Sequence, residues 1–148
     1  GLEYTTEDGT TSRPAMIHRA MLGSVERFLG VYIEHCAGAF PTWLAPVQAV
    51  VIGITDQQND YVTQVAHQID QAGLRVETDT RNEKVGYKRR EAEVQKIPYM
   101  LVTGAREEAA GKVAVRMRGT GDQGNMDLDE VIQMIQDDIR MTLATSSG

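Results

Sequence analysis

The spacing of apolar and polar residues changes several times in the last two thirds of the chain, which predicts alternating strands and helices. Short runs rich in apolar and β-branched residues at 47–54, 74–79 and 99–104 are typical of strands, the first and last of them buried. Residues 112–118 alternate strictly between apolar and polar or small side chains, which indicates a strand with one half-exposed face. Four strands are therefore expected.

Helical spacing of apolar residues occupies the intervals between the first three of these strands. One helix is expected to begin at Asn59 or Asp60 and to end at Gly73, a good C-terminal capping residue. A second helix is expected over 87–97, and Pro98 terminates it. Each of these helices connects two predicted strands.

The clearest helix lies at the C-terminal end of the chain. Asp127 can cap it, with Glu130 three residues later, and six apolar residues form one stripe: Leu128, Val131, Ile132, Ile135, Ile139 and Leu143. The resulting order is strand, helix, strand, helix, strand, strand, helix. It predicts a layered α/β domain with a mixed, mostly parallel sheet flanked by helices and a hairpin near its end.

The first 40 residues do not fit that scheme. Residues 16–21 alternate as a strand would, and after Gly23 and Ser24 a helix carries Val25, Phe28, Leu29, Tyr32 and Ile33 at helical spacing. One strand and one helix cannot bury their apolar faces alone. We therefore expect residues 1–40 to be the end of a larger domain and residues 41–148 to form a second domain.

Composition narrows the class of protein. The 148-residue chain has one cysteine, Cys36, and no apolar run near the roughly 20 residues that span a bilayer. Its N-terminus is polar and acidic, unlike a targeting segment. We expect a soluble cytoplasmic protein with neither disulfides nor a membrane partner.

The distribution of charge points to an anionic partner that the net charge of −6 conceals. Residues 81–118 contain ten Lys and Arg against five Asp and Glu, which gives this segment +5 and the rest of the chain −11. The basic residues include the exposed face of the predicted strand at 112–118. Such a patch favours a nucleic acid or another anion. The alternative is a solvated surface of ion pairs.

Arg27 is electrostatically unusual. Ser24 is a plausible N-cap, so Arg27 falls in the first helical turn, where the helix dipole disfavours a cation by about 0.3 to 1 kcal/mol. The residue is expected either to bind an anion or to pair with Glu26 or another nearby carboxylate.

The segment RPAMIHRAMLGSVERFLG resembles motif 3 of class II aminoacyl-tRNA synthetases, and specifically that of the bacterial threonyl-tRNA synthetases. The segments FPTWLAPVQ, DTRNEKVGYKRRE, PYMLVTG and GKVAVRMRG resemble the C-terminal anticodon-binding domain of that family. The resemblance implies that residues 1–40 are a strand-helix remnant of the antiparallel catalytic sheet and that 41–148 bind the anticodon.

In this family threonine and ATP, bound with Mg²⁺, form threonyl-adenylate, and the threonyl group is then transferred to tRNA. The resemblance implies that Arg27 is catalytic and contacts the γ-phosphate of ATP, and that Gly23 and Ser24 line the adenylate site. It also implies that His18 is one ligand of a zinc ion that selects threonine, the other ligands lying upstream. His35, Cys36 and His67 do not show the paired spacing that is typical of zinc-binding motifs.

The anticodon contacts of the family carry over to Asn82, Arg90, Glu107 and Arg116. Lys96 stands where an arginine is usual, and a lysine ammonium lacks the paired donors with which a guanidinium makes a bidentate contact. Amide, guanidinium and carboxylate groups of this kind read the edges of unstacked bases.

Three further basic residues, Lys84, Lys88 and Arg89, are expected to contact phosphates, which position the RNA without specifying its sequence. Tyr87 is expected either to stack on a base or to lie in the core.

Two alternatives to a threonine–tRNA ligase remain open. One is the anticodon-binding part of a prolyl-, histidyl- or glycyl-type enzyme, which the MIHRA segment disfavours, and the other is a tRNA-binding α/β module without catalytic activity. The family is dimeric, chiefly through catalytic-domain surfaces, and this chain alone is expected to be inactive.

Overall fold

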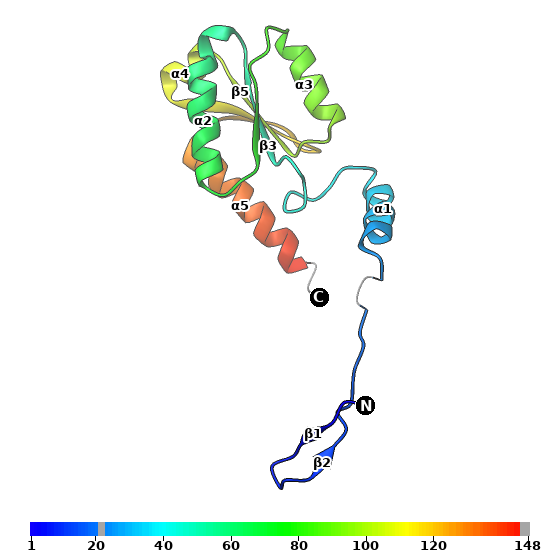
Figure 1. The fold of residues 1–148 in the computed structure, drawn as a ribbon. Helices are drawn as coiled ribbons and strands as arrows, with labels where there is room; N and C mark the ends of the chain where they lie inside the picture. The colour runs from blue at the N-terminus through cyan, green and yellow to red at the C-terminus, as the bar shows by residue number, and fades with distance from the viewer. Residues whose placement is uncertain (21–22, 146–148) are drawn as a thin grey trace. The chain divides into compact units, whose positions relative to one another are not determined.

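The computed structural model describes residues 1–20 and 23–145 of the chain (Figure 1). The chain divides into two compact units, Gly1–Tyr32 and Ile33–Gly148. The second unit contains the α/β fold and is described first.

A five-stranded mixed sheet forms the centre of the second unit. Its strands are β3 (Ala49–Gly53), β4 (Val76–Asp79), β5 (Tyr99–Thr103), β6 (Lys112–Met117) and β7 (Gly121–Asp127), in the order β4-β3-β5-β6-β7. The pairs β3–β4 and β3–β5 are parallel, whereas β5–β6 and β6–β7 are antiparallel. The predicted mixed α/β sheet is confirmed, although two of its four strand pairs are antiparallel, so it is not mostly parallel.

A short 3₁₀ turn and four helices connect or follow these strands. They are η1 (Asp56–Gln58), α2 (Asn59–Gln71), α3 (Val85–Val94), α4 (Ala105–Ala110) and α5 (Leu128–Thr145). Helices α2 and α3 lie on opposite sides of β3 (Figure 1). The fold is therefore layered, as the sequence predicts.

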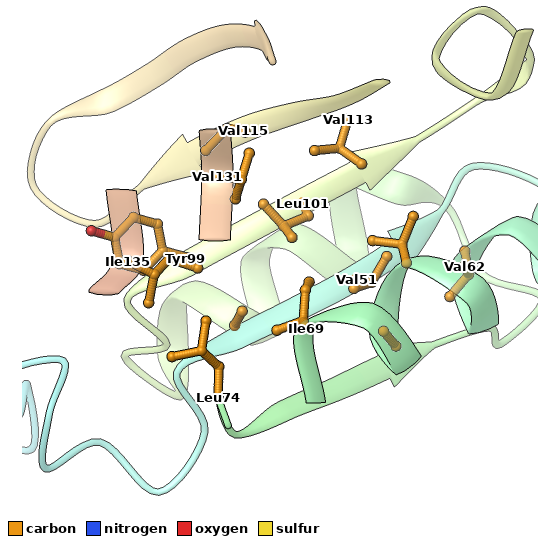
Figure 2. Packing of buried hydrophobic residues seen from close by; sticks show 13 residues of the cluster. Val51, Val62, Ile69, Leu74, Tyr99, Leu101, Val113, Val115, Val131 and Ile135 are labelled. Carbon is orange, nitrogen blue, oxygen red and sulfur yellow. The ribbon is translucent and has the colours of Figure 1, made fainter. Parts of the chain in front are cut away.

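Alternation along the strands divides the core between the two faces of the sheet. On one face, Val51 and Leu101 pack with Val62 and Ile69 of α2, and α5 adds Val131 to the same cluster (Figure 2). On the other face, a smaller cluster joins the sheet to α3: Val50, Ile52, Ala92, Ile97 and Met100. Helix α3 is therefore held to the sheet by fewer apolar side chains than α2 and α5.

The helix termini follow the expected chemistry with one difference. Gly73, just after α2, has φ +80°, and the backbone N–H of Asp127 donates to Glu130 Oε2 at 3.3 Å at the start of α5. Helix α3 spans residues 85–94 rather than the predicted 87–97. It ends early because Lys96 adopts the left-handed conformation, with φ +61°, ahead of Pro98.

The segment before β3 is fastened to the second unit by hydrogen bonds. The Arg75 guanidinium donates to the carbonyls of Ala45 and Trp43 at 3.0 and 2.8 Å. Thr42 and Tyr99 both donate to the carboxylate of Asp138 on α5. The stretch from Thr42 to Ala45 is thus an integral part of the sheet domain.

The first unit contains a hairpin that the sequence pattern did not predict, β1 (Tyr4–Thr5) with β2 (Thr11–Ser12). Helix α1 (Val25–Cys36) begins in this unit, as predicted. The predicted strand at 16–21 is wrong for residues 16–20, and Met21 lies outside the described residues. A strand needs a partner for its N–H and C=O groups, and no described strand pairs with this segment.

Among the described residues, no helix combines the length and the apolar composition needed to cross a bilayer.

Candidate nucleic-acid interface

Strand β6 exposes its basic side because its apolar side is buried. Val113 and Val115 are 0% and 1% exposed in the larger core, so Ala114 and Arg116 project from the opposite face of the sheet. Helix α3 covers β5 on that face through Met100. Part of the sheet beside α3 is therefore available to a partner.

Two cavities lie between α3 and β6, and Arg116 lines both. The larger, of about 440 Å³, has Ile97, Met100 and Met117 as apolar lining and Glu93, Lys96, Arg116 and Arg118 as charged lining. The smaller, of about 130 Å³, is lined by Arg89, Val102, Ala114, Val115, Arg116 and Asp122. We refer to the two cavities together as the α3–β6 groove.

Arg116 is restrained but not buried. Its Nε lies 3.5 Å from Glu93 Oε1, and about a third of the side chain is exposed. An ion pair this open contributes little stability, so exchanging it for a ligand costs little. Arg116 is therefore placed to accept an anionic or hydrogen-bonding partner.

Arg118 organises one end of the groove. Its guanidinium donates to the carbonyls of Lys96 and Phe40, and its backbone N–H donates to Pro98 at 2.8 Å. Partial burial lowers the pKa of Arg118 below its ordinary value. The residue thus fixes the turn that carries Lys96, and its role here is structural.

The residues expected to contact the anticodon divide into three sets. Lys96 and Arg116 meet in the larger cavity. Glu107, half-buried in α4, accepts hydrogen bonds from the Gly104 N–H at 3.0 Å and from Asn125 Nδ2 at 3.4 Å. Because Asn125 pairs in register with Ala114, Glu107 lies at the β6–β7 side of the same sheet face.

Asn82 and Arg90 are placed differently. Asn82 is exposed in the turn between β4 and α3, and Arg90 is exposed on α3 itself. Neither is among the described residues that line the two cavities. Arg89, one residue before Arg90, lines the smaller cavity instead.

The prediction that Lys88 contacts phosphate is wrong. Lys88 is 3% exposed, and its Nζ donates to the carbonyls of Gly53 and Asp79 at 3.0 and 3.2 Å. A side chain held in this way cannot reach a surface phosphate. Lys84 and Tyr87 are exposed, as a contact with RNA requires.

Glu93 was not singled out by sequence reasoning, although a signal for it exists. It follows Arg89 by four residues within α3, which places these two side chains on one side of the helix axis. That spacing could have identified the α3 wall of the groove.

Part of the basic segment is neutralised by ion pairs. Arg81 contacts both Asp79, at 2.6 Å between Nη2 and Oδ2, and Glu91. The hydrogen bonds from Arg81 lower the pKa of Asp79 below its ordinary value of 3.8. The alternative of a paired surface thus holds around Arg81 and for Arg116 with Glu93, whereas Lys96 in the same cavity forms no ion pair within the described residues.

The predicted nucleotide site in the first unit has a consistent local geometry. Ser24 Oγ accepts a hydrogen bond from the Arg27 N–H at 3.3 Å and donates to Glu26 Oε2 at 2.7 Å, so Ser24 caps α1. Arg27 is exposed and, within the described residues, forms no ion pair. Gly23 has φ +65°, a conformation that favours glycine.

The zinc site is not formed by the described part of this chain. No group of three or more His, Cys, Asp and Glu within residues 1–20 and 23–145 could hold a metal ion. His18 is exposed in an irregular segment, so it supplies at most one donor there. Its role as a zinc ligand stays a prediction.

Comparison with known proteins gives concordant similarities. Residues 48–138 match the family model described as "Anticodon binding domain". The chain is 55% identical over 140 residues to a threonine–tRNA ligase of Clostridium botulinum strain Loch Maree (type A3), covering 95% of this chain and 22% of the relative. The chain thus spans about a fifth of the length of the curated relatives it matches.

Two solved structures extend the comparison to the fold. The RNA-binding domain of threonyl-tRNA synthetase from Cryptosporidium parvum Iowa II matches with a TM-score of 0.83 and 35% identity, over 92% of this chain and 35% of that one. Histidyl-tRNA synthetase from Nostoc sp. PCC 7120 matches with a TM-score of 0.60 and 27% identity, over 74% of this chain and 27% of that one. With residues 48–138 matched to its model, the chain belongs to the anticodon-binding domain family.

Proposed function

We propose that this chain is the C-terminal part of a threonine–tRNA ligase and that residues 41–148 read the anticodon of the threonine tRNA. The observation that carries the proposal is the 55% identity along 95% of the chain with a curated threonine–tRNA ligase. The α3–β6 groove supports it, because the groove joins a basic surface to cavities that could accept a base.

Recognition of the anticodon rests on unstacked bases. Threonine codons require G and U at the second and third anticodon positions, and single-stranded RNA is read on the Watson–Crick edges of splayed bases. Arg116 supplies a guanidinium and Glu107 a carboxylate, and Lys96 adds one charge in the larger cavity. The apolar lining there gives a base a surface on which to pack.

Asn82 and Arg90 contribute from outside the groove. They are carried on the exposed turn and the exposed side of α3. An anticodon loop has several nucleotides to place, so it can contact the groove and this outer surface together. Lys84 and Arg89 contribute phosphate contacts between the groove and this outer surface.

The whole enzyme would activate threonine with ATP and Mg²⁺, and transfer it to tRNA. Arg27, at the amino end of α1, would contact the γ-phosphate, because a guanidinium binds phosphate with two parallel donors. Gly23 and Ser24 would line the adenylate site. The zinc ion with His18, a homodimer and a cytoplasmic location belong to the same proposal.

A histidyl- or prolyl-type enzyme is the second candidate. The histidyl-tRNA synthetase of Nostoc shares this fold at 27% identity, less than half the identity found with the threonine–tRNA ligases. The similarity therefore favours the threonine enzyme.

The proposal is tested by titrating the 148-residue chain with anticodon stem-loops of the threonine, histidine and proline tRNAs. The threonine loop is expected to bind at least about tenfold more tightly, because wrong bases typically cost about 1 to 3 kcal/mol each. Tighter binding of the histidine or proline loop would assign the chain to the second candidate. Equal binding of all three would favour a module without sequence preference.

A further inference from the structure

Among the described residues, Lys88 is the most deeply buried charged residue, and it does not line the α3–β6 groove. It is 3% exposed, and lysine is almost never buried to this extent unless it is paired. Its ammonium donates to the carbonyl oxygen of Gly53 at 3.0 Å and to that of Asp79 at 3.2 Å. Gly53 and Asp79 are the last residues of β3 and β4.

The ammonium therefore joins the carboxyl ends of two neighbouring parallel strands. Strand β3 leads to α2 on one face of the sheet, and its parallel neighbour β4 leads to α3 on the opposite face. The ammonium thus holds together the strand ends from which these two connections start. Lys88 also lines a cavity of about 210 Å³, together with Asp79, Arg81 and Glu91.

The same hydrogen bond holds one end of the segment that carries several of the predicted RNA contacts. Residues 80–84 join β4 to α3 and include Asn82 and Lys84. The bond from Lys88 to the Asp79 carbonyl connects the first turns of α3 to the start of this segment. Arg81 makes a second connection, from Asp79 to Glu91 on α3.

Few apolar contacts compete with these bonds in positioning α3. Lys88 and Ala92 are the two buried residues of the helix, and Arg89, next to Lys88, lines the smaller cavity. The ammonium thus restrains the amino-terminal half of α3 against the ends of β3 and β4, next to the Arg89 side of the α3–β6 groove.

We infer that Lys88 is a positioning residue for anticodon recognition, which fixes the 80–84 segment and Arg89 by binding the carbonyl ends of β3 and β4 and does not itself touch RNA. The inference rests on the proposed function. It assigns this lysine, one of ten basic residues in the 81–118 segment, to discrimination between bases rather than to electrostatic attraction.

The test compares Lys88→Met with Lys84→Met in the 148-residue chain. Each variant loses one positive charge, but Lys84 is exposed and Lys88 is not. Both are titrated at several salt concentrations against the threonine stem-loop and a loop with a changed second anticodon base. Lys84→Met is expected to reduce the salt slope by a little under one unit and to leave the ratio of the two affinities unchanged.

Lys88→Met is expected to leave the salt slope at the wild-type value and to reduce that ratio by about tenfold, the size of one misplaced base contact. Lys88→Arg keeps the charge and its donors on a longer side chain, and it is expected to retain more thermal stability than Lys88→Met with a similarly reduced ratio. A folded variant at position 88 that keeps the wild-type ratio overturns the inference. A wild-type chain that does not discriminate overturns the proposed function instead.

A measurement on the wild-type chain covers the case in which neither variant folds. Lysines are acylated with a small reagent, with and without the stem-loop, and the extent is measured by mass spectrometry. Lys88 is expected to be unreactive in both states, whereas Lys84 reacts in the free chain and is protected by RNA. Reaction of Lys88 at the rate of Lys84 in the free chain contradicts the inference.

Discussion

Arg116 is the residue of the α3–β6 groove whose substitution is expected to change RNA binding most. It lines both cavities, and the carboxylate of Glu93 restrains its Nε at 3.5 Å. Its neighbour along the exposed side of β6 is Ala114, which leaves room beside it. A guanidinium in this setting can exchange a weak ion pair for a base edge.

Arg116→Ala is expected to weaken binding of the threonine stem-loop by about 1 to 3 kcal/mol and to narrow its advantage over a loop with a changed second base. The measurement is a titration of wild type and variant with both loops. Lys112→Ala is the matched control, since Lys112 lies on the same side of β6 and pairs with Asp127 at 3.2 Å. An unchanged ratio of affinities in Arg116→Ala would show that the basic side of β6 is a solvated surface.

Asp79 links stability to acid pH. Hydrogen bonds from Arg81 lower its pKa below the ordinary value of 3.8, so the folded state favours the charged carboxylate. The stability it contributes is present above about pH 4 and is lost as the pH falls through the lowered pKa. Asp79→Asn is expected to make the free energy of unfolding depend less steeply on pH between about pH 5 and pH 2, as measured by urea unfolding. A pH dependence equal to that of the wild type would exclude this contribution.

At the scale of elements, the success of prediction follows the strength of the apolar pattern. Strand β6 and helix α5 were located because one side of each is buried continuously, as at Val113, Val115 and Ile135. Strand β7 was missed because Gly121–Asp127 has two glycines and one large apolar residue, and its structure comes from pairing with β6. Helix α4 is only six residues long, too short for a periodic pattern.

Alternation alone was insufficient in the first unit. Residues 16–20 alternate but have no strand to pair with among the described residues, and Ile17 is 89% exposed. The burial of Lys88 was equally hidden, because nothing in its spacing separates it from the exposed lysines around it. Both outcomes depend on tertiary partners, which a local pattern does not contain.

Helix α5 should contribute stability through its apolar stripe. Ile135 is fully buried against the sheet, so Ile135→Ala is expected to lower the free energy of unfolding by about 2 to 5 kcal/mol. Arg140→Ala is the control on the same helix, because the Arg140 side chain is 69% exposed and its ion pair with Asp137 is open, and about 0.5 kcal/mol or less is expected. Equal losses in the two variants, measured by urea unfolding, would contradict the packing of α5 against the sheet.

For the molecule as a whole, the candidate RNA-binding surface was easier to recognise in the sequence than the residues that support it from inside. The excess of basic residues between 81 and 118 was visible from composition, and the resemblance to the synthetase family placed Asn82 and Glu107 within it. The supports are Arg118, which binds the carbonyls of Lys96 and Phe40, and Lys88, which binds the carbonyl ends of two strands. These residues are basic too, so charge alone could not distinguish them from RNA contacts.

The central claim is that this domain reads the second and third bases of the anticodon. The most direct measurement is the affinity of the unmodified 148-residue chain for the threonine stem-loop and for two loops that differ from it at one of those bases, all at one salt concentration. Each substitution is expected to weaken binding by about 1 to 3 kcal/mol, or roughly fivefold to 150-fold. Equal affinity for the three loops would contradict the claim and would reduce the α3–β6 groove to a site of non-specific attraction.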